Sequence, residues 1–310
     1  ADVIEWSNDM SAEIWRYHDG AWTKVRKAPT FLGPGGYRYP EGIGYRYMTT
    51  FKDKYGVEAI YAGVGQGFGT TLLIKSTDGT NWNKVRFGQV PPPYDTRTMT
   101  VHNGKLYVGM GFGGTGAVFG TDDPNPTTDT WVKVAEFDAD FGIGALKSFN
   151  GYLYAVTWEG IGVGGFHVWR SNAQAPSDPT LGDWTLVVDG GAGDNWNPMG
   201  ADIESFKDNL YVGSMSLPIV SDEQPSLHAP KGFDLIRVDK EDNWDLIVGN
   251  YQVPPERQTV PRGPPLSGWP SGFGNPFNFY CWQLEEHCDL LYLGSFDATS
   301  FLRFIPIDII

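Results

Sequence analysis

One short phrase recurs five times along the chain, and it constrains the fold more than any other feature. The copies read AIYAG at 59–63, KLYVG at 105–109, YLYAV at 152–156, NLYVG at 209–213 and LLYLG at 290–294. A phrase that returns in this way marks a supersecondary unit that cannot bury its apolar face alone, so neighbouring units stack. We therefore predict an all-β chain that forms a β-propeller.

The companions of each copy keep a constant order, which predicts four antiparallel strands per blade. A first strand and a tight turn, such as Asn103-Gly104 or Asn150-Gly151, come before the phrase, and this dipeptide suits a two-residue hairpin. A third strand follows at 72–75, 117–120, 166–170, 233–238 and 301–304. The outer strands are expected to begin at Trp22, Trp82, Trp131, Trp184 and Trp244.

The number of blades has two interpretations. The run AEIWRY at 12–17 resembles a sixth third strand, and the opening ADVIEWSN then counts as a degenerate second strand, so we favour six blades over five. On either count the first and last blades are incomplete. We expect the N-terminal strands and the FIPIDII tail to close the ring, because closure removes exposed sheet edges.

The whole chain, 1–310, is interpreted as one propeller domain. Closed all-β architectures routinely exceed the usual 100–200 residues of a domain. The Pro- and Gly-rich segment 250–278 resembles a linker, but strand signals resume directly after it. We therefore predict a long, ordered surface loop there.

Composition limits the possible partners and compartments. The formal net charge of −14 argues against nucleic acid and anionic membrane surfaces, since both require a basic footprint. No apolar run reaches the roughly 18 residues of a membrane-spanning helix. The 40 Gly and 12 Trp, together with the negative charge, favour a secreted or periplasmic protein over an acidic cytosolic one.

The two cysteines, Cys281 and Cys288, are predicted to be free thiols. Aligning LLYLG with KLYVG places Cys288 in a hairpin turn and Cys281 about 7 residues back along the partner strand, at roughly 3.3 Å per residue. A disulfide requires Cα atoms within about 7 Å of each other. A regular hairpin therefore excludes this bridge.

The two ends of the propeller differ in their loops. One end receives only short turns, and the other receives the long segments 33–44, 88–96, 189–200, 214–231 and 250–278. Long irregular loops on a rigid scaffold are where binding sites usually lie. We place the functional site at that end.

Superposing the first strands gives a set of equivalent residues that should line the central channel. These residues, which we call the ring positions, are Arg46, Arg97, Gly144, Ala201 and Trp282. Two positions later the alignment gives an apolar set that should form the core between blades: Met48, Met99, Leu146, Ile203 and Leu284. Since the core set is uniform and the ring set is not, the ring positions are expected to carry function.

Arg46 and Arg97 belong to neighbouring blades and share the pattern Arg-x-Met-Thr. Two guanidiniums in this arrangement can bind one carboxylate, sulfate or phosphate through bidentate hydrogen bonds. Gly144 and Ala201 are expected to leave room opposite, and Trp282 offers a flat face for a sugar or aromatic ring. In the alternative interpretation, both arginines pair with channel carboxylates such as Asp202 or Glu204.

Further ligand-binding candidates on the loop-rich end are Trp158, Trp196 and Asn278. The histidines are too scattered for a multi-histidine metal centre. Calcium is the one cofactor considered, because carboxylate oxygens are its preferred ligands. Its candidate residues are Asp138, Asp140 and Asp194, although no fixed ligand spacing is present.

Three segments carry a resemblance to a known group of proteins. AEIWRYHDGAWTKV, NGKLYVG and KSTDGTNW resemble the repeats of secreted bacterial and archaeal propeller proteins, which are loosely related to the Asp-box repeats of sialidases. The resemblance covers nearly the whole chain, and its motifs are structural. It implies a propeller fold and export, and it leaves the activity open.

Three interpretations of function follow. The first is an extracellular propeller that binds an acidic glycan or another small anionic ligand in one asymmetric pocket. The second is a lyase or hydrolase acting on a uronate-containing or other anionic substrate in that pocket, with Tyr280 or Tyr94 as base or acid and Glu204 or Asp202 assisting. The third is a scaffold for protein contacts.

Overall fold

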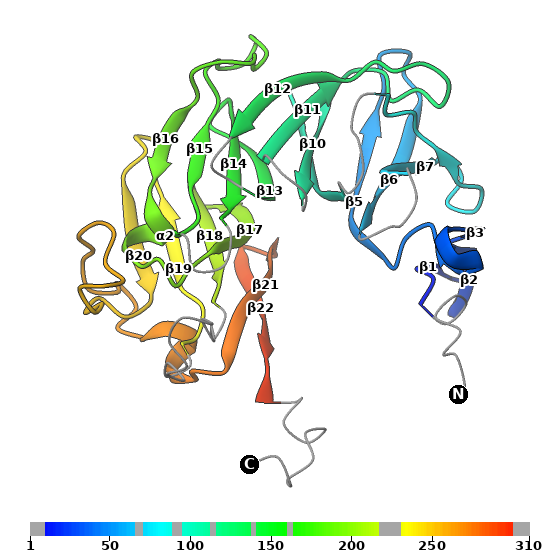
Figure 1. The fold of residues 1–310 in the computed structure, drawn as a ribbon. Coiled ribbons are helices and arrows are strands. Elements are labelled where there is room, and N and C mark those ends of the chain that lie inside the picture. Colours follow the sequence, from blue (N-terminus) through cyan, green and yellow to red (C-terminus); the bar gives the residue numbers. More distant parts are fainter. Residues whose placement is uncertain are drawn as a thin grey trace, which may run out of the picture.

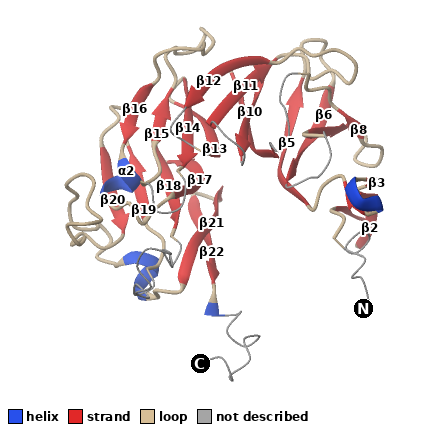
Figure 2. Ribbon diagram, viewed as in Figure 1, coloured by secondary structure: helices blue, strands red, loops and turns tan. Residues whose placement is uncertain are grey.

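The computed structural model describes residues 10–65, 71–88, 95–111, 116–137, 141–159, 164–216 and 231–299. The expected strands in ADVIEWSN and at 301–304 lie outside these residues. Nearly all regular structure in the described part is antiparallel β-sheet, as predicted (Figure 2). In the same residues, no helix is long and apolar enough to cross a membrane.

Four blades of four antiparallel strands follow one another along an arc (Figure 1). The first blade contains β5 (Gly44–Lys52), β6 (Glu58–Gly65), β7 (Leu73–Ser76) and β8 (Asn83–Lys84). The second contains β9 (Asp95–His102), β10 (Lys105–Gly111), β11 (Gly116–Thr121) and β12 (Val132–Phe137). The third contains β13 (Gly142–Phe149), β14 (Tyr152–Trp158), β15 (Val168–Arg170) and β16 (Thr185–Val188). The fourth contains β17 (Met199–Phe206), β18 (Asn209–Met215), β19 (Leu235–Val238) and β20 (Trp244–Val248).

A hairpin lies at each end of the arc (Figure 1). The N-terminal hairpin pairs β1 (Glu13–His18) with β2 (Ala21–Lys27), and the C-terminal hairpin pairs β21 (Asn278–His287) with β22 (Leu290–Asp297). A shorter hairpin, β3 (Thr30–Leu32) with β4 (Arg38–Pro40), follows β2. Within the described residues β1 pairs only with β2, and β22 pairs only with β21. The closure was predicted between the N-terminal strands and the FIPIDII tail, and that tail lies outside the described residues.

The predicted turns between first and second strands are confirmed. Asn103-Gly104 and Asn150-Gly151 have φ values of 47° and 72°, and of 49° and 77°. Positive φ at both central residues is the type I′ geometry that matches the twist of a hairpin. In the fourth blade the same turn is formed by Lys207-Asp208, and in the C-terminal hairpin by Cys288-Asp289.

The described residues form five apolar core clusters, and each lies between two successive units of the arc. For example, Phe51 and Tyr61 of the first blade pack with Met99 and Leu106 of the second. Side chains of a strand alternate between its two faces, so an inner blade buries one face against each neighbour. At the ends, Ile14 of β1 packs on the first blade, and Leu284 of β21 packs on the fourth.

The set predicted to form the core between blades is confirmed at four of its five positions. Met99, Leu146, Ile203 and Leu284 are between 0% and 4% exposed. The prediction is wrong for Met48, which is 44% exposed. Met48 lies on β5 of the first blade, where no first strand of a preceding blade covers it.

The segment 250–278, predicted to be a long surface loop, joins β20 to β21. It contains the short 3-10 turn η2 (Ser271–Gly274). Its Arg262 donates to Asp234 at 2.8 Å, and both side chains are almost fully buried. Its Arg257 donates to both carboxylate oxygens of Asp194, at 3.1 and 2.5 Å. Asp194 directly follows the four-residue turn α2 (Gly190–Gly193). These buried ion pairs fix the loop to the third and fourth blades.

Both cysteines are free, which confirms the prediction. Cys281 is buried on β21, and Cys288 is exposed in the turn before β22. Burial raises the pKa of the Cys281 thiol well above its usual value. This thiol therefore stays protonated and packs as a small apolar side chain.

Candidate functional site

The backbone singles out the ring positions by a bulge in each first strand. In β9, Thr96 pairs with Met110 and Thr98 pairs with Gly109, which leaves Arg97 as the extra residue. The same shift in register occurs at the other four ring positions: Arg46, Gly144, Ala201 and Trp282. A β-bulge leaves one residue outside the ladder and redirects its side chain. Repeated bulges therefore aim these residues at one place.

All five ring positions line a single pocket of about 90 Å³. Each ring position lies near the beginning of its first strand, which is the end of the molecule that receives the long loops. The remaining lining residues are Tyr47, Thr98, Asp202, Tyr280 and Gln283. The predicted convergence of the ring positions is thus confirmed, and we refer to this cavity as the ring pocket.

The arginine side chains of the ring pocket lie across glycines of the neighbouring second strands. A Cβ atom at Gly65 of β6 would lie 2.4 Å from Cγ of Arg46. A Cβ atom at Gly111 of β10 would lie 2.5 Å from Oδ1 of Asp95 and 3.2 Å from Cβ of Arg97. The equivalent residues in the third and fourth blades are Trp158 and Met215, and there the ring position is not arginine. Gly65 therefore makes space for Arg46, and Gly111 makes space for both Asp95 and Arg97.

The charges of Arg46 and Arg97 are not balanced by ion pairs among the described residues. No carboxylate of that part of the chain lies within 4.0 Å of either guanidinium, and the buried Nε of Arg46 has no hydrogen-bond partner. Arg97 donates a long hydrogen bond to Sδ of Met199 at 3.7 Å. Burial lowers the pKa of Arg97, the charge of Arg46 lowers it further, and Asp95 acts in the opposite direction.

The alternative in which Asp202 or Glu204 pairs with the arginines is not what the structure shows. Oδ2 of Asp202 accepts a hydrogen bond from the backbone N–H of Leu284 at 2.6 Å. Glu204 forms an ion pair with Lys147 and does not line the ring pocket. Oγ1 of Thr98, at the position equivalent to Asp202, accepts from the N–H of Leu146 at 3.0 Å. Asp202 and Thr98 thus make the same bond between successive first strands.

Asp202 combines this bond with an unusual protonation equilibrium. It is 9% exposed and lines the ring pocket. Burial raises the pKa of Asp202 to about 7, and the charge of Glu204 contributes in the same direction. Backbone hydrogen bonds from Leu284 and Ile203 act against this rise. A carboxyl group with this pKa can hold or release a proton near neutral pH.

The C-terminal hairpin contributes the aromatic side of the ring pocket. Tyr280 and Trp282 lie with their ring centroids 5.6 Å apart, and Phe296 of β22 lies against both. Burial raises the pKa of Tyr280, and the positive charges of Arg97 and Arg46 partly offset this rise. The phenol is therefore neutral at physiological pH, and it lies near both arginines. Trp282 is 57% exposed and presents a free aromatic surface.

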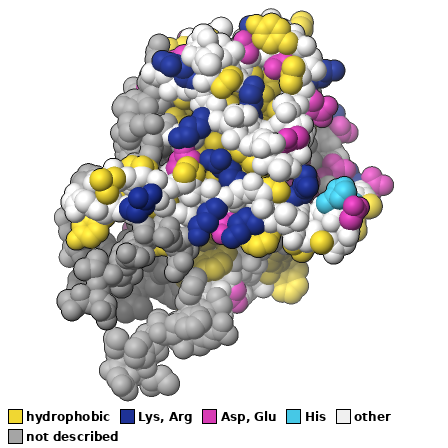
Figure 3. Space-filling model, turned by 90° about the vertical axis from the view of Figure 1, so that its right-hand side faces the viewer, with side chains coloured by type: hydrophobic (Ala, Val, Ile, Leu, Met, Phe, Trp, Pro, Cys, Tyr) yellow, Lys and Arg dark blue, Asp and Glu magenta, His cyan; other side chains and the backbone are white. Residues whose placement is uncertain are grey.

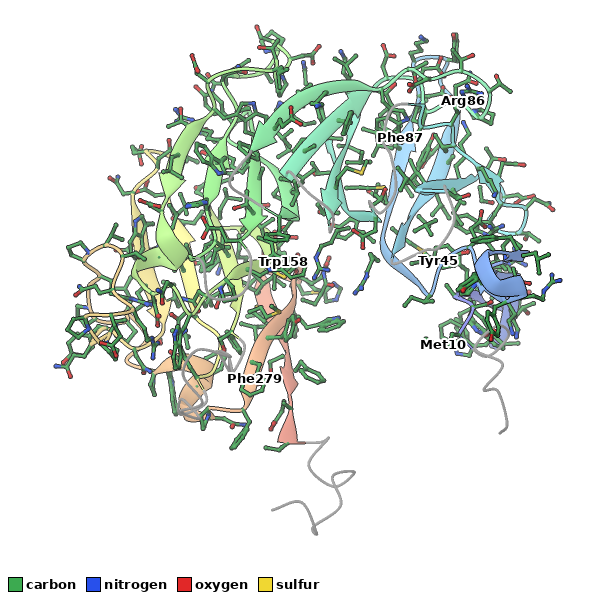
Figure 4. All side chains as sticks on the ribbon, in the orientation of Figure 1. Met10, Tyr45, Arg86, Phe87, Trp158 and Phe279 are labelled. Carbon is green, nitrogen blue, oxygen red and sulfur yellow. The ribbon has the colours of Figure 1, made fainter. Side chains whose placement is uncertain are left out.

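Trp158 lies at the edge of the ring pocket. The guanidinium of Arg97 lies 5.8 Å from the centre of its ring, within the range of a cation–π contact. Trp158 also pairs with Met199 of the next blade, and Met215 pairs with Tyr280. Figure 4 labels Trp158 at the end of β14 that lies closest to β21. These pairs join the third blade, the fourth blade and the C-terminal hairpin beside the pocket.

Trp196 and Asn278, which were expected to bind a ligand, do not line the ring pocket. The ring of Trp196 is covered by the guanidinium of Arg257, 3.9 Å from its centre, so this tryptophan anchors its own loop. Asn278 is half-buried, and its Nδ2 donates a long hydrogen bond of 3.4 Å to the carbonyl of Gly272. Tyr94 lies outside the described residues.

The small side chain at Gly144 is required by packing, which corrects the expectation that it leaves room for a ligand. A Cβ atom at this position would lie 2.0 Å from the carbonyl oxygen of Gly200. The first strands of the third and fourth blades therefore approach each other too closely there for any side chain. Ala201 is half-buried and does line the open space of the pocket.

Asp194 is not available to a calcium ion, contrary to the expectation from the sequence. It is fully buried, and its carboxylate oxygens are taken by Arg257. Asp138 and Asp140 lie outside the described residues. Within the part of the chain that is described, no group of three or more His, Cys, Asp or Glu is placed to hold a metal ion.

The formal charge of −14 is not spread evenly over the surface. Figure 3 shows several Lys and Arg side chains gathered across the middle of one face, with single acidic side chains between them. Although the protein is acidic overall, this face therefore does not repel an anionic ligand. Local clusters of one sign raise the concentration of oppositely charged ligands.

Several residues of the site were missed from the sequence alone. Tyr47, Thr98 and Gln283 follow the ring positions by one residue, and they were missed because strand alternation suggested the opposite face. The bulges reduce that alternation locally. Gly65 and Gly111 could have been recognised from the sequence. The last residue of the repeated phrase begins a Gly-x-Gly pattern only in the two blades whose ring position is arginine.

No protein-family profile and no curated protein sequence matches the chain. Solved structures with a similar arrangement include the GH43 protein BlXynB from Bacillus licheniformis, at 10% identity and a TM-score of 0.38 over 68% of this chain. They also include an α-L-arabinofuranosidase from Clostridium thermocellum, at 14% identity and a TM-score of 0.41 over 76% of this chain and 80% of that one. A third is the extracellular domain of a putative one-component system from B. thetaiotaomicron, at 10% identity and a TM-score of 0.41 over 93% of this chain and 38% of that one. The matched region spans 43% of the BlXynB chain.

Proposed function

We propose that the ring pocket binds the anionic group of an acidic glycan or of another small anionic ligand. The observation that carries this proposal is the presence of two guanidiniums, from neighbouring blades, in one pocket without an ion pair among the described residues. A carboxylate, sulfate or phosphate would supply the missing counter-charge. Charge-assisted bidentate hydrogen bonds from arginine are the strongest contacts available to such groups.

The electrostatics of the free pocket support the same proposal. Burying a cation is costly unless it is paired, and two adjacent cations repel each other as well. The pKa of Arg97 is lowered by the same two effects, because burial and the charge of Arg46 are its two largest causes. A bound anion would reduce both the cost of burying the guanidinium and its repulsion from Arg46. The protein therefore holds in place, before binding, the charges that an anion needs.

The aromatic side of the pocket favours a ligand with a ring. Trp282 is half-exposed beside Tyr280, and an indole face can lie against a sugar ring while the arginines hold its acidic group. The five ring positions differ in chemistry, so the pocket is asymmetric and suits one ligand orientation. We also propose that the protein is secreted or periplasmic, which its composition supports.

The test is a calorimetric titration with oligogalacturonate and, in parallel, with the matching neutral galactooligosaccharide. We expect only the acidic ligand to bind. We expect Arg46→Ala/Arg97→Ala to weaken it by about 2–5 kcal/mol if the contact is desolvated. Arg38→Ala removes an exposed arginine outside the pocket and serves as the matched control. Unchanged affinity in the double variant would contradict the proposal.

Turnover of the same ligand is a second candidate, and Asp202 is the observation that favours it. A carboxyl group with a pKa of about 7 in the pocket can donate a proton to a leaving group or accept one, as in lyases and hydrolases. Tyr280 is the second proton-transfer candidate, and it lines the same pocket. Product formation from acidic oligosaccharides that Asp202→Asn abolishes, while binding persists, would establish an enzyme. Binding without product would leave a binding protein.

A further inference from the structure

The segment that joins β20 to β21 lines a second, open pocket, which is much larger than the ring pocket. Its volume is about 430 Å³, within the range of roughly 300–1,000 Å³ that is typical of small-molecule sites. It is lined by two glycines and by Asn250, Tyr251, Gln252, Pro264, Pro265 and Pro270. We refer to it as the loop pocket. It lies on the loop-rich end of the molecule, as the ring pocket does.

The lining of the loop pocket contains no ionisable group apart from the phenol of Tyr251. A charged ligand would therefore lose its hydration there without gaining a counter-charge. The amides of Asn250 and Gln252 can donate to and accept from hydroxyl groups, although Oδ1 of Asn250 already accepts a long hydrogen bond of 3.4 Å from the N–H of Ser271. In the described part of the chain the Gln252 amide makes one hydrogen bond, of 3.4 Å, to the neighbouring Tyr251 hydroxyl. Most of its hydrogen-bonding capacity remains open.

Exposed aromatic rings lie in and beside the loop pocket. Tyr251 and Trp269 are 50% and 55% exposed, and both belong to the same segment. Trp269 contacts Phe273 edge-on, at 6.4 Å between centroids, and Phe273 is itself 41% exposed. Tyr and Trp combine an apolar face with a polar atom, which suits ligands that are apolar on one side and hydroxylated at the edge. Sugar rings have this character.

The loop pocket is held in shape by bonds to the fourth blade. The N–H of Gly249 donates to the carbonyl of Trp269 at 3.0 Å, and the N–H of Leu266 donates to the carbonyl of Leu246 at 2.8 Å. The buried pair of Arg262 with Asp234 fixes the middle of the segment. A ligand therefore does not have to order the loop, and preorganisation lowers the cost of binding.

We propose that the loop pocket binds uncharged sugar units of a glycan. Amide groups and a phenol recognise the hydroxyls, and the exposed aromatic faces stack on the ring. This site is separate from the anion site of the ring pocket and does not depend on it. A glycan with both acidic and neutral units has a place for each on the same end of the propeller.

The test is a set of calorimetric titrations with neutral hexasaccharides of glucose, mannose, galactose, xylose and arabinose. We expect at least one to bind, and we expect Tyr251→Ala/Gln252→Ala to weaken it at least tenfold. Both residues are exposed, so the variant should keep its fold, which thermal unfolding verifies. Tyr55→Ala removes an exposed tyrosine elsewhere and is the matched control. Arg46→Ala/Arg97→Ala should leave this binding unchanged, which separates it from the ring pocket.

Three results would overturn the inference. One is that none of the five hexasaccharides binds at millimolar concentration. Another is that binding is equally strong in Tyr251→Ala/Gln252→Ala. The third is that a polyproline decapeptide binds in place of sugars and loses its affinity in that variant, which would assign the pocket to peptides instead.

Discussion

Among the described residues, β1 and β22 each have one edge with no partner strand, and these two edges carry complementary parts of the repeat. In three of the four complete blades, the tyrosine of the repeated phrase pairs with a cationic residue of the third strand: Tyr61 with Lys75, Tyr154 with Arg170, and Tyr211 with Arg237. The N-terminal hairpin supplies a third and an outer strand, and the C-terminal hairpin supplies a first and a second strand. The same alignment sets Tyr292 opposite Arg16. We predict that β22 and β1 pair in this register and complete a fifth blade.

The perturbation is a pair of cysteines, Tyr292→Cys with Arg16→Cys, in a Cys288→Ser background that removes the exposed native thiol. Directly opposed residues of antiparallel strands have Cα atoms about 4.5–5.5 Å apart, which suits a disulfide. The bridge would close a loop of roughly 280 residues, for which the chain-entropy relation gives about 5.6 kcal/mol as an upper value for the gain in stability. Urea unfolding with and without reducing agent measures the gain.

The matched control is Tyr292→Cys with Arg303→Cys, which tests whether the segment 301–304 is the missing third strand. Formation of the 16–292 bridge within one chain, with higher stability in the oxidised form, would support five blades. Formation of the 292–303 bridge alone would refute the predicted pairing and favour six blades. Disulfide-linked dimers of the 16–292 variant would show that the two edges pair between copies, which also contradicts the prediction.

Two further predictions concern the ring pocket. Burial raises the pKa of Asp202 from 3.8 to about 7, so the stability that this group contributes is complete below about pH 4 and is lost as the pH rises to 7. Asp202→Asn keeps an acceptor for the N–H of Leu284 but does not titrate. The stability of the wild type relative to the variant should therefore fall by up to about 4 kcal/mol between pH 4 and pH 8, measured by urea unfolding. A difference that does not change with pH would contradict the assigned pKa. Gly144→Ala should destabilise the protein by roughly 1–3 kcal/mol, because its Cβ would overlap the carbonyl of Gly200. Gly44→Ala has nothing within 4 Å of its Cβ and should be nearly neutral, and equal effects of the two substitutions would refute this explanation.

The ring pocket was predictable because it follows from the repeat. In β9, β13, β17 and β21 the two-residue turn begins six residues after the ring position, so aligning the turns also aligned Arg97 and Trp282. Arg46 aligned with Arg97 through the shared pattern Arg-x-Met-Thr, because β5 ends in a longer turn. The core between the blades followed for the same reason, since apolar residues recur at a fixed offset. Met48 is the exception to this buried set. Its burial depends on how the two ends of the chain meet, and no local sequence pattern encodes that contact.

The features that were not predicted depend on contacts between distant segments. Asp194 was a candidate for calcium and Trp196 a candidate for ligand binding, but Arg257 reaches both of them from more than 60 residues away. Nothing in the repeat relates these positions, because the segment 250–278 has no counterpart in the other blades. The loop pocket escaped prediction for the same reason. The sequence of a propeller thus predicts the features that all blades share better than it predicts a segment that occurs in only one blade.

The bulges at the ring positions have a consequence for how this site can change. A bulged residue lies outside the hydrogen-bond ladder, and pairing resumes on both sides of it with the register shifted by one residue. Replacing Arg46, Arg97, Ala201 or Trp282 therefore alters the chemistry of the pocket without moving a strand, whereas Gly144 is fixed by its neighbour. Selectivity for a ligand can diverge at four positions while the scaffold stays constant. Proteins that share these blades can accordingly differ in what they bind.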